Sequence, residues 1–221
     1  YSDEDQLVTI ATMLQHAQHL YERNDSFRSG NNQTRGMSAL AMLGILFRDF
    51  EGADAWYDLA MTRLEEHLEM EINDDGFQFE RSVHYHMSDI GNYFYVYQLA
   101  KRNGISVSLT WEAKLKSLFS TLVYLAYPDK TAPVLQDDTE IPWAERNEIA
   151  EIMALGYILF EDPEFGFLSA EKVNASMYWF IDNSQFLSLA SIDARQPSVE
   201  SYSFDHTGYY IMREGWNPKN H

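Results

Sequence analysis

Apolar residues recur every three or four positions along much of the chain. Within residues 5–22 they stand at Leu7, Ile10, Ala11, Leu14, Ala17 and Tyr21, and within residues 52–72 at Trp56, Ala60, Leu64 and Leu68, with charged residues opposite. This spacing predicts two amphipathic helices. The polar segment 24–36 predicts a break between them, followed by another helix from about Met37 to Phe47.

Turn signals set the next boundaries. Asn73-Asp74-Asp75-Gly76 predicts the end of the helix before it. In residues 77–87 the apolar positions follow neither the period of a helix nor that of a strand. We therefore expect a loop that enters a helix capped by Ser88. That helix is predicted to end near Arg102, before an Asn-Gly pair.

Further helices are predicted downstream. Thr110 is expected to cap one with a clear apolar stripe, which ends before Pro128. After a long loop over residues 129–142, another helix is predicted over residues 143–160 and a short one near 169–181. Six or seven helices joined by loops are what a helical toroid or bundle requires, and the sequence contains no convincing repeat.

The pattern changes after Ser184. Residues 187–190 and 209–213 are predicted to be strands. A lone strand cannot bury its faces, and the chain stops soon afterwards at His221. We therefore expect a helical domain over residues 1–184 and, over residues 185–221, the start of a sheet domain that is mostly absent.

Composition narrows the class of protein. The 221 residues are 45% hydrophobic and 14% aromatic, enough for a packed core, and no apolar run is long enough to span a membrane. The net charge of −18 makes a nucleic-acid or anionic-membrane partner improbable. A locally basic cleft for a polyanionic sugar is still compatible with this charge. Without cysteine there are no disulfides or thiolate metal sites.

A tyrosine between two histidines is the most informative candidate for chemistry. Tyr85 lies between His84 and His86, with Glu80, Arg81 and Ser82 just before them. A tyrosine transfers protons poorly unless its pKa is lowered, and flanking imidazoles and an arginine could lower it. The alternative is a buried, hydrogen-bonded tyrosine. Two histidines at i, i+2 without a third ligand indicate no metal site, and we expect no cofactor.

Other polar residues admit two interpretations each. Asn31 and Asn32 either cap a helix or point an amide into a cleft. Glu80 is either a base or an exposed loop carboxylate. Asp137 and Asp138 either form a glycosidase-type carboxylate pair or belong to a solvated acidic loop. Four aromatic residues could stack on sugars but at helical spacing are more often core, namely Trp56, Tyr93, Tyr95 and Trp143.

Four segments in this order resemble the heparinase II/III-like polysaccharide lyases. They are an asparagine-bearing turn, an Asp-Gly…Glu-x-Ser…Tyr-His signature, a Pro-Asp…Pro…Asp loop and a strand, found here at residues 30–35, 75–86, 128–138 and 208–216. The second and fourth segments are fairly specific. The resemblance spans roughly residues 28–217.

The resemblance implies a mainly α fold, in which an incomplete α/α toroid is followed by the first strands of an antiparallel β-sandwich. It also implies β-elimination on a uronic-acid-containing polysaccharide by a bacterial periplasmic or secreted enzyme. Asn31 matches the residue that neutralises the uronate carboxylate, and Tyr85 matches the general acid, which is also the base in some members. His86 follows the tyrosine in the family pattern. Supporting or substrate-binding roles are expected for Asn32, Arg35, Glu80, Arg81 and His84.

One departure from the family matters. The family has a further histidine a little beyond the strand matched here, and neither His206 nor His221 fits it. We therefore expect this piece alone to be inactive or nearly so. The small number of basic residues favours a weakly sulfated heparan or alginate as substrate. A glycoside hydrolase using Asp137 or Asp138 with Glu80, and a non-catalytic sugar-binding module, are the alternatives.

Overall fold

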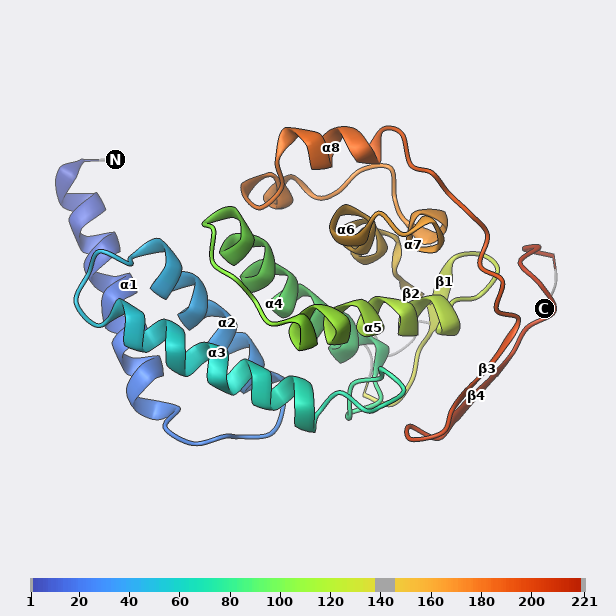
Figure 1. The fold of residues 1–221 in the computed structure, drawn as a ribbon, viewed down its shortest axis with the longest axis horizontal. Helices are drawn as coiled ribbons and strands as arrows, with labels where there is room; N and C mark the ends of the chain where they lie inside the picture. Colours follow the sequence, from blue (N-terminus) through green and yellow to red (C-terminus); the bar gives the residue numbers. More distant parts are fainter. Residues whose placement is uncertain (1, 138–145, 220–221) are drawn as a thin grey trace.

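The computed structural model describes residues 2–137 and 146–219 and is mainly helical (Figure 1). In chain order the elements are α1 (Asp3–Arg23), α2 (Asn31–Leu46), α3 (Ala53–Met70), α4 (Val83–Arg102), α5 (Leu109–Leu125), β1 (Thr131–Pro133), β2 (Arg146–Glu148), α6 (Ala150–Phe160), α7 (Pro163–Leu168), the 3-10 helix η1 (Ala175–Trp179), α8 (Asn183–Leu189), β3 (Ser201–Phe204) and β4 (Tyr209–Met212). This arrangement confirms the predicted mainly α fold.

The core lies where α2 to α6 meet. Helix α2 packs against both α3 and α4, while α5 contacts α3, α4, α6 and α7. Helix α5 buries a stripe of large apolar side chains, namely Trp111, Leu115, Leu118, Phe119 and Leu122. Helix α1 buries only Ala17 and lies at the edge (Figure 1). The helices that carry the candidate residues, α2 and α4, therefore stand on a rigid base.

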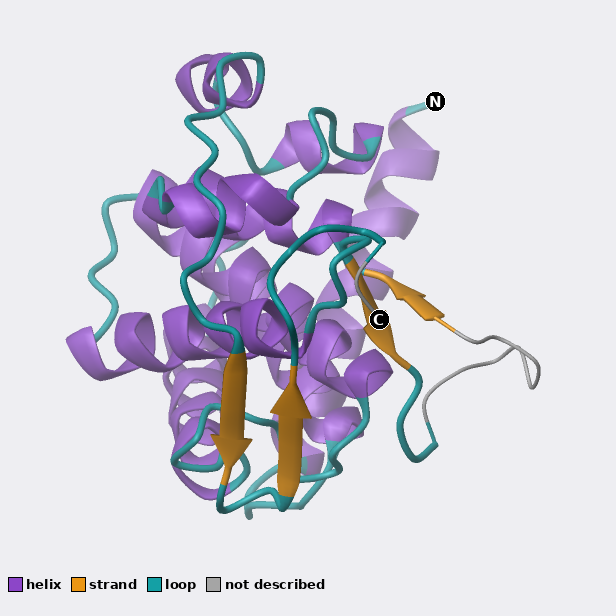
Figure 2. Ribbon diagram, turned by 90° about the vertical axis from the view of Figure 1, so that its right-hand side faces the viewer, coloured by secondary structure: helices purple, strands orange, loops and turns teal. Residues whose placement is uncertain are grey.

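Strands β3 and β4 form an antiparallel hairpin that docks on the helices (Figure 2). Its turn is held by Asp75, whose carboxylate accepts hydrogen bonds from the backbone N–H of Thr207 at 2.8 Å and from its hydroxyl at 2.9 Å. Phe204 is fully buried against Phe77, with ring centroids 5.6 Å apart. The turn that contains Asp75 and Gly76, a few residues after α3, therefore anchors the hairpin.

Three helices begin earlier than predicted. Helix α2 starts at Asn31 rather than near Met37. Ser82 caps α4, since its hydroxyl accepts from the N–H of Tyr85, and the expectation of a cap at Ser88 is wrong. Ser108, rather than Thr110, caps α5. The predicted ends of these helices are close to those observed.

The second half of the chain contains further corrections. Residues 146–148 form β2, so α6 starts at Ala150 rather than at 143; residues 143–145 lie outside the described residues. The strand predicted at 187–190 is wrong, because Asp182 and Gln185 form a capping box that starts α8. The predicted strand at 209–213 is confirmed as β4, and its partner β3 was missed. The domain boundary at 184 stays a prediction, and α8 runs across it.

Candidate active site

Tyr85 lies in the first turn of α4, and Asp137 faces it. The Tyr85 hydroxyl donates to Asp137 Oδ2 at 3.3 Å. Ser82 joins the two residues by their backbones, because its hydroxyl accepts from the Tyr85 N–H at 3.3 Å and donates to the Asp137 carbonyl at 3.2 Å. One serine therefore starts the helix and fixes the loop that carries the acceptor of the phenol.

The charges around Tyr85 act opposite to the sequence-based expectation. The negative charge of Asp137, some desolvation, the hydrogen bond to Asp137 and the charge of Glu80 all raise the pKa of Tyr85, and only Arg35 opposes them. The prediction that neighbouring imidazoles lower this pKa is wrong. His84 makes an edge-to-face contact with the Tyr85 ring, and the His86 ring is fully buried in the core. The phenol therefore keeps its proton at neutral pH.

Asn31 is brought to the same end of the helix pair as Tyr85. Helices α2 and α4 pack in parallel, because Arg35 Nη2 donates to Ser88 Oγ at 3.5 Å and Ser38 Oγ donates to the carbonyl of Asn92 at 2.9 Å. These contacts have sequence offsets of 53 and 54. The same offsets place Asn31 opposite residues 84 and 85. Asn31 is the first residue of α2 and is partly exposed.

The residues predicted to bind substrate occupy the rim of this end. Asn32, Arg35 and Arg81 are exposed, and Glu80 and His84 are half-buried. Glu80 is fixed by the buried Gln78 side chain, whose amide nitrogen donates to the Glu80 carboxylate at 2.7 Å and whose amide oxygen accepts from the Glu80 N–H at 2.9 Å. The structure thus brings these predicted residues together with Tyr85.

His86 has a different environment. It is fully buried, its Nδ1 accepts from the N–H of Gln78 at 3.3 Å, and its Nε2 donates to the carbonyl of Leu118 at 2.8 Å. Burial lowers its pKa to about 4, against the opposing hydrogen bond to Leu118. A neutral imidazole with both nitrogens paired links α4 to α5 and to the loop before α4. It has no free nitrogen to offer a substrate.

The other predicted candidates are buried, partly buried or outside the described residues. Trp56 and Tyr93 are core residues, and Tyr95 is half-buried against Phe180. Asp138 and Trp143 lie outside the described residues. In the part of the chain that the structure describes, no three His, Asp or Glu side chains gather into a possible metal site. No helix there is long and apolar enough to cross a membrane.

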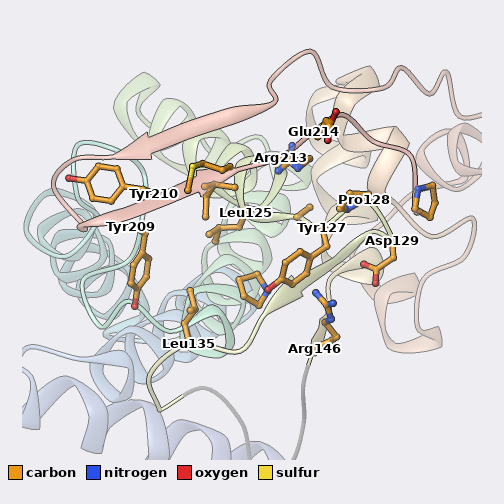
Figure 3. A pocket seen from close by; sticks show the side chains of 15 residues that line it. Leu125, Tyr127, Pro128, Asp129, Leu135, Arg146, Tyr209, Tyr210, Arg213 and Glu214 are labelled. Atoms are coloured by element: carbon orange, nitrogen blue, oxygen red, sulfur yellow. The ribbon is translucent and has the colours of Figure 1, made fainter. Parts of the chain in front are cut away.

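A cavity of about 550 Å³ opens beside the site, between β4 and the connection from α5 to β1 (Figure 3). Polar and aromatic side chains line it, including Tyr127, Asp129 and Arg146, whose guanidinium lies 3.7 Å from the centroid of the Tyr127 ring. Tyr209 links the cavity to the candidate site, since its hydroxyl donates to the carbonyl of Arg81 at 3.2 Å and accepts from Gln136 at 3.3 Å.

Sequence reasoning did not predict the contacts that hold this site together. Asp137 was considered as a glycosidase-type carboxylate, paired with Asp138 or Glu80, or as part of a solvated acidic loop, and Tyr209 only as part of a strand. Both lie in the segments on which the family resemblance rests, so their place in those segments was the available signal. Nothing in the local sequence indicated that Gln136 would contact Tyr209 or that the Gln78 side chain would hold Glu80.

The arrangement combines a proton donor with groups that bind an anion. A protonated phenol can donate a proton, and the amide of Asn31 and the guanidinium of Arg35 can donate hydrogen bonds to an anion. The amino ends of two parallel helices add partial positive charge at the same place. This combination suits a ligand that carries a carboxylate next to an oxygen that must be protonated.

Comparison with known proteins identifies the family. The profile of the family described as Heparinase II/III N-terminus matches residues 1–155. The chain belongs to this family. It is also 26% identical over 200 residues to part of a heparin-sulfate lyase of Bacteroides thetaiotaomicron and 21% identical over 208 residues to part of one of Pedobacter heparinus.

Solved structures of this family share the fold. A crystal structure of heparinase III superposes with a TM-score of 0.75 over 97% of this chain at 22% identity, and heparan sulfate lyase HepC from Pedobacter heparinus does so with a TM-score of 0.64 at 18% identity. The two lyases matched by sequence extend well beyond this chain. The alignments cover 86% and 91% of the chain but only 26% and 28% of those lyases.

Proposed function

We propose that the chain is part of a polysaccharide lyase that cleaves a uronic-acid-containing polysaccharide by β-elimination. Membership of the heparinase II/III family supports this proposal, and so do the names of the relatives, which are heparin-sulfate lyases. The observation on which it depends most is the position of Asn31 and Tyr85 at the same end of two parallel helices.

In the proposed reaction a base removes the proton at C5 of the uronate. The electrons of that C–H bond form the C4–C5 double bond, and the C4–O bond breaks. We assign to Tyr85 the donation of a proton to the departing oxygen, because its raised pKa keeps the phenol protonated. The base comes from another group.

The C5–H bond is a very weak acid while the neighbouring carboxylate is charged. We assign to Asn31 the hydrogen bond that stabilises this carboxylate as it gains enolate character, with Arg35 adding positive charge. Asn32, Arg81 and His84 are proposed to bind the flanking sugars. His86 is proposed to act from the core, by holding α4 in place, and Glu80 to orient the rim.

A weakly sulfated heparan is the preferred substrate class in this proposal, with alginate second. The names of the relatives favour heparan sulfate, while 34 acidic against 16 basic residues disfavour a heavily sulfated chain. We further propose a periplasmic or secreted location, which the family resemblance alone supports. The 221 residues without the rest of the lyase are expected to be inactive or nearly so.

The test is the ultraviolet absorbance of the unsaturated product, measured with the longer lyase on heparan sulfate and on alginate. Tyr85→Phe and Asn31→Ala should each lower kcat by at least about a hundredfold. Tyr95→Phe on the same helix and Asn183→Ala, also the first residue of its helix, are matched controls and should keep kcat.

Three outcomes would contradict parts of the proposal. No unsaturated product from the longer protein on either polymer would refute the lyase function. New reducing ends without ultraviolet absorbance, with Tyr85→Phe still active, would indicate a hydrolase that uses Asp137 and Glu80. Strong turnover by the 221 residues alone would refute the expectation that they are inactive.

A further inference from the structure

We propose that two side chains at the carboxyl end of α3, His67 and Glu71, form a clamp that positions Asn31 for the reaction, with Glu71 as its decisive member. His67 lies in the last turn of α3 and Glu71 is its C-cap, while Arg63, four residues before His67, contacts the start of the loop before α2 instead. The contacts of His67 and Glu71 reach Gly30, immediately before α2, and Gln33 in its first turn. This inference rests on the proposed function, because it assigns positioning residues to the same site.

Glu71 grips the residue immediately before Asn31. The backbone N–H of Gly30 donates to Glu71 Oε1 at 3.0 Å and to Oε2 at 3.2 Å, although the two residues are 41 positions apart. Gly30 is the N-cap of α2, and no side chain there caps the helix. A carboxylate from another helix therefore fixes the backbone that leads into the candidate carboxylate-binding amide.

His67 ties Glu71 to the first turn of α2. Its ring is fully buried, with Nδ1 2.7 Å from Glu71 Oε2 and Nε2 3.1 Å from Gln33 Oε1. Both ring nitrogens therefore lie within hydrogen-bonding distance of a side-chain oxygen, one on each side of the start of α2. Gln33 in turn accepts from the N–H of Arg28 at 2.7 Å and donates to Asn24 Oδ1 at 3.0 Å. The same network therefore fixes both sides of Asn31.

Charge makes this grip stronger than an ordinary hydrogen bond. Burial would raise the pKa of Glu71, but the hydrogen bonds from His67 and Ser29, the charge of His67 and the Gly30 N–H together lower it. Glu71 is thus ionised where it meets the Gly30 N–H, and charge-assisted hydrogen bonds are the shorter and stronger kind. Glu71 is only 5% exposed, so water competes little for it.

Arg63 provides the internal comparison. Its guanidinium donates to the carbonyls of Asn24 and Asp25, at the start of the same loop but well before Asn31. Losing Arg63 should loosen the loop without moving Asn31. Losing Glu71 should move the start of α2 itself. The two variants therefore separate a positioning role from a general contribution to stability.

The kinetic experiment uses the longer lyase. Glu71→Gln should lower kcat at least about tenfold with KM little changed, because small displacements of a catalytic group cost rate. Arg63→Gln should lower the unfolding temperature and keep kcat. In an Asn31→Ala background, Glu71→Gln should lower kcat no further, an outcome that a purely structural role would not give.

The second experiment needs no activity. In the 221-residue chain, the amide proton of Gly30 should give a strongly downfield NMR signal that moves upfield in Glu71→Gln, while Gly104, in an open loop, stays unchanged. If Glu71→Gln does not fold, Glu71→Asp is measured instead. It keeps the negative charge but shortens the side chain by one methylene, and the same changes in kcat and in the Gly30 signal are expected.

The possible outcomes distinguish a failure of the clamp from a failure of the proposed lyase function. Wild-type kcat in Asn31→Ala would overturn the proposed role of Asn31 and, with it, the reason for the clamp. Loss of activity in Asn31→Ala together with wild-type kcat in Glu71→Gln would overturn the clamp alone. An unmoved Gly30 amide signal would also overturn it.

Discussion

The two helices that carry the candidate catalytic groups are fixed at their amino ends in different ways. At α4 the cap is local: the Ser82 hydroxyl accepts from the N–H of Tyr85, three residues on. At α2 the N-cap is a glycine without a side chain, and its N–H is held by Glu71 from another helix. The phenol is therefore placed by its own neighbours in sequence, and the amide by tertiary structure.

This difference implies different sensitivities. A local cap survives changes elsewhere, while the start of α2 depends on the buried Glu71 carboxylate, whose loss leaves the Gly30 N–H without this acceptor. Two further buried groups lie in the first half of α4.

His86 supports the first turn of α4. Asp89 lies one turn further along, and the charges of His67, Glu80 and Glu71 contribute to its pKa.

The largest expected effect is a pair of opposite pH dependences. Burial lowers the pKa of His86 to about 4, so the neutral ring stabilises the fold above its unfolded pKa near 6.5, and this contribution is lost as pH falls toward 4. Burial raises the pKa of Asp89 to about 7, so protonated Asp89 contributes stability that is lost as pH rises through 7. In the wild-type chain the two effects nearly cancel between pH 5 and 7.

Single substitutions should expose each slope. From pH 7 to pH 5, Asp89→Asn should lose about 2 kcal/mol of unfolding free energy and His86→Gln should gain about 2 kcal/mol, both measured by urea denaturation. If the unfolding free energy changed with pH in the same way in both variants, His86 and Asp89 would not titrate as their burial implies.

The next effect concerns the glycine at the start of α2. Gly30 has φ 103° and ψ 161°, a backbone conformation that essentially only glycine adopts, although a Cβ there would meet no atom within 4 Å. Gly30→Ala should therefore cost about 2 kcal/mol through backbone strain alone. The measurement is again urea denaturation.

Gly104→Ala is the matched control for Gly30→Ala. Gly104 also has a positive φ and open surroundings, but it lies far from Asn31 in the sequence, after α4. It should cost stability without shifting the NMR signals of residues 30–33. Unchanged stability in Gly30→Ala would mean that α2 can start in another conformation, and the contrast between the two helix ends would disappear.

The same contrast explains which parts of the molecule the sequence could predict. The apolar spacing of α3 and α5 gave these helices correctly, because each buries one face. The spacing also gave α1, although that helix buries only Ala17. Residues 83–87 were expected to be a loop because His84, Tyr85 and His86 break the apolar period. In the structure His86 occupies a core position beside Val83 and Ile90, so a histidine completes the buried face.

The site was predictable only in part, for the same physical reason. Tyr85, Asn31 and the rim residues could be named from motifs within single segments. The hydrogen bonds from Tyr85 to Asp137 and from Gly30 to Glu71 join residues 52 and 41 positions apart, and no local pattern encodes such pairs. The direction of the Tyr85 pKa shift was wrong because it depends on Asp137, which the chain brings in from a distant loop.

The smallest expected effect tests where α4 begins. Ser82→Ala removes the oxygen that accepts from the Tyr85 N–H and should cost about 1 kcal/mol of unfolding free energy. Ser88→Ala removes a hydroxyl inside the helix whose contact with Arg35 is long, at 3.5 Å, and should change stability by less than about 0.5 kcal/mol. If Ser88→Ala instead cost as much as Ser82→Ala, the helix would start where the apolar pattern alone had put it, and Tyr85 would lie in a loop without a local cap.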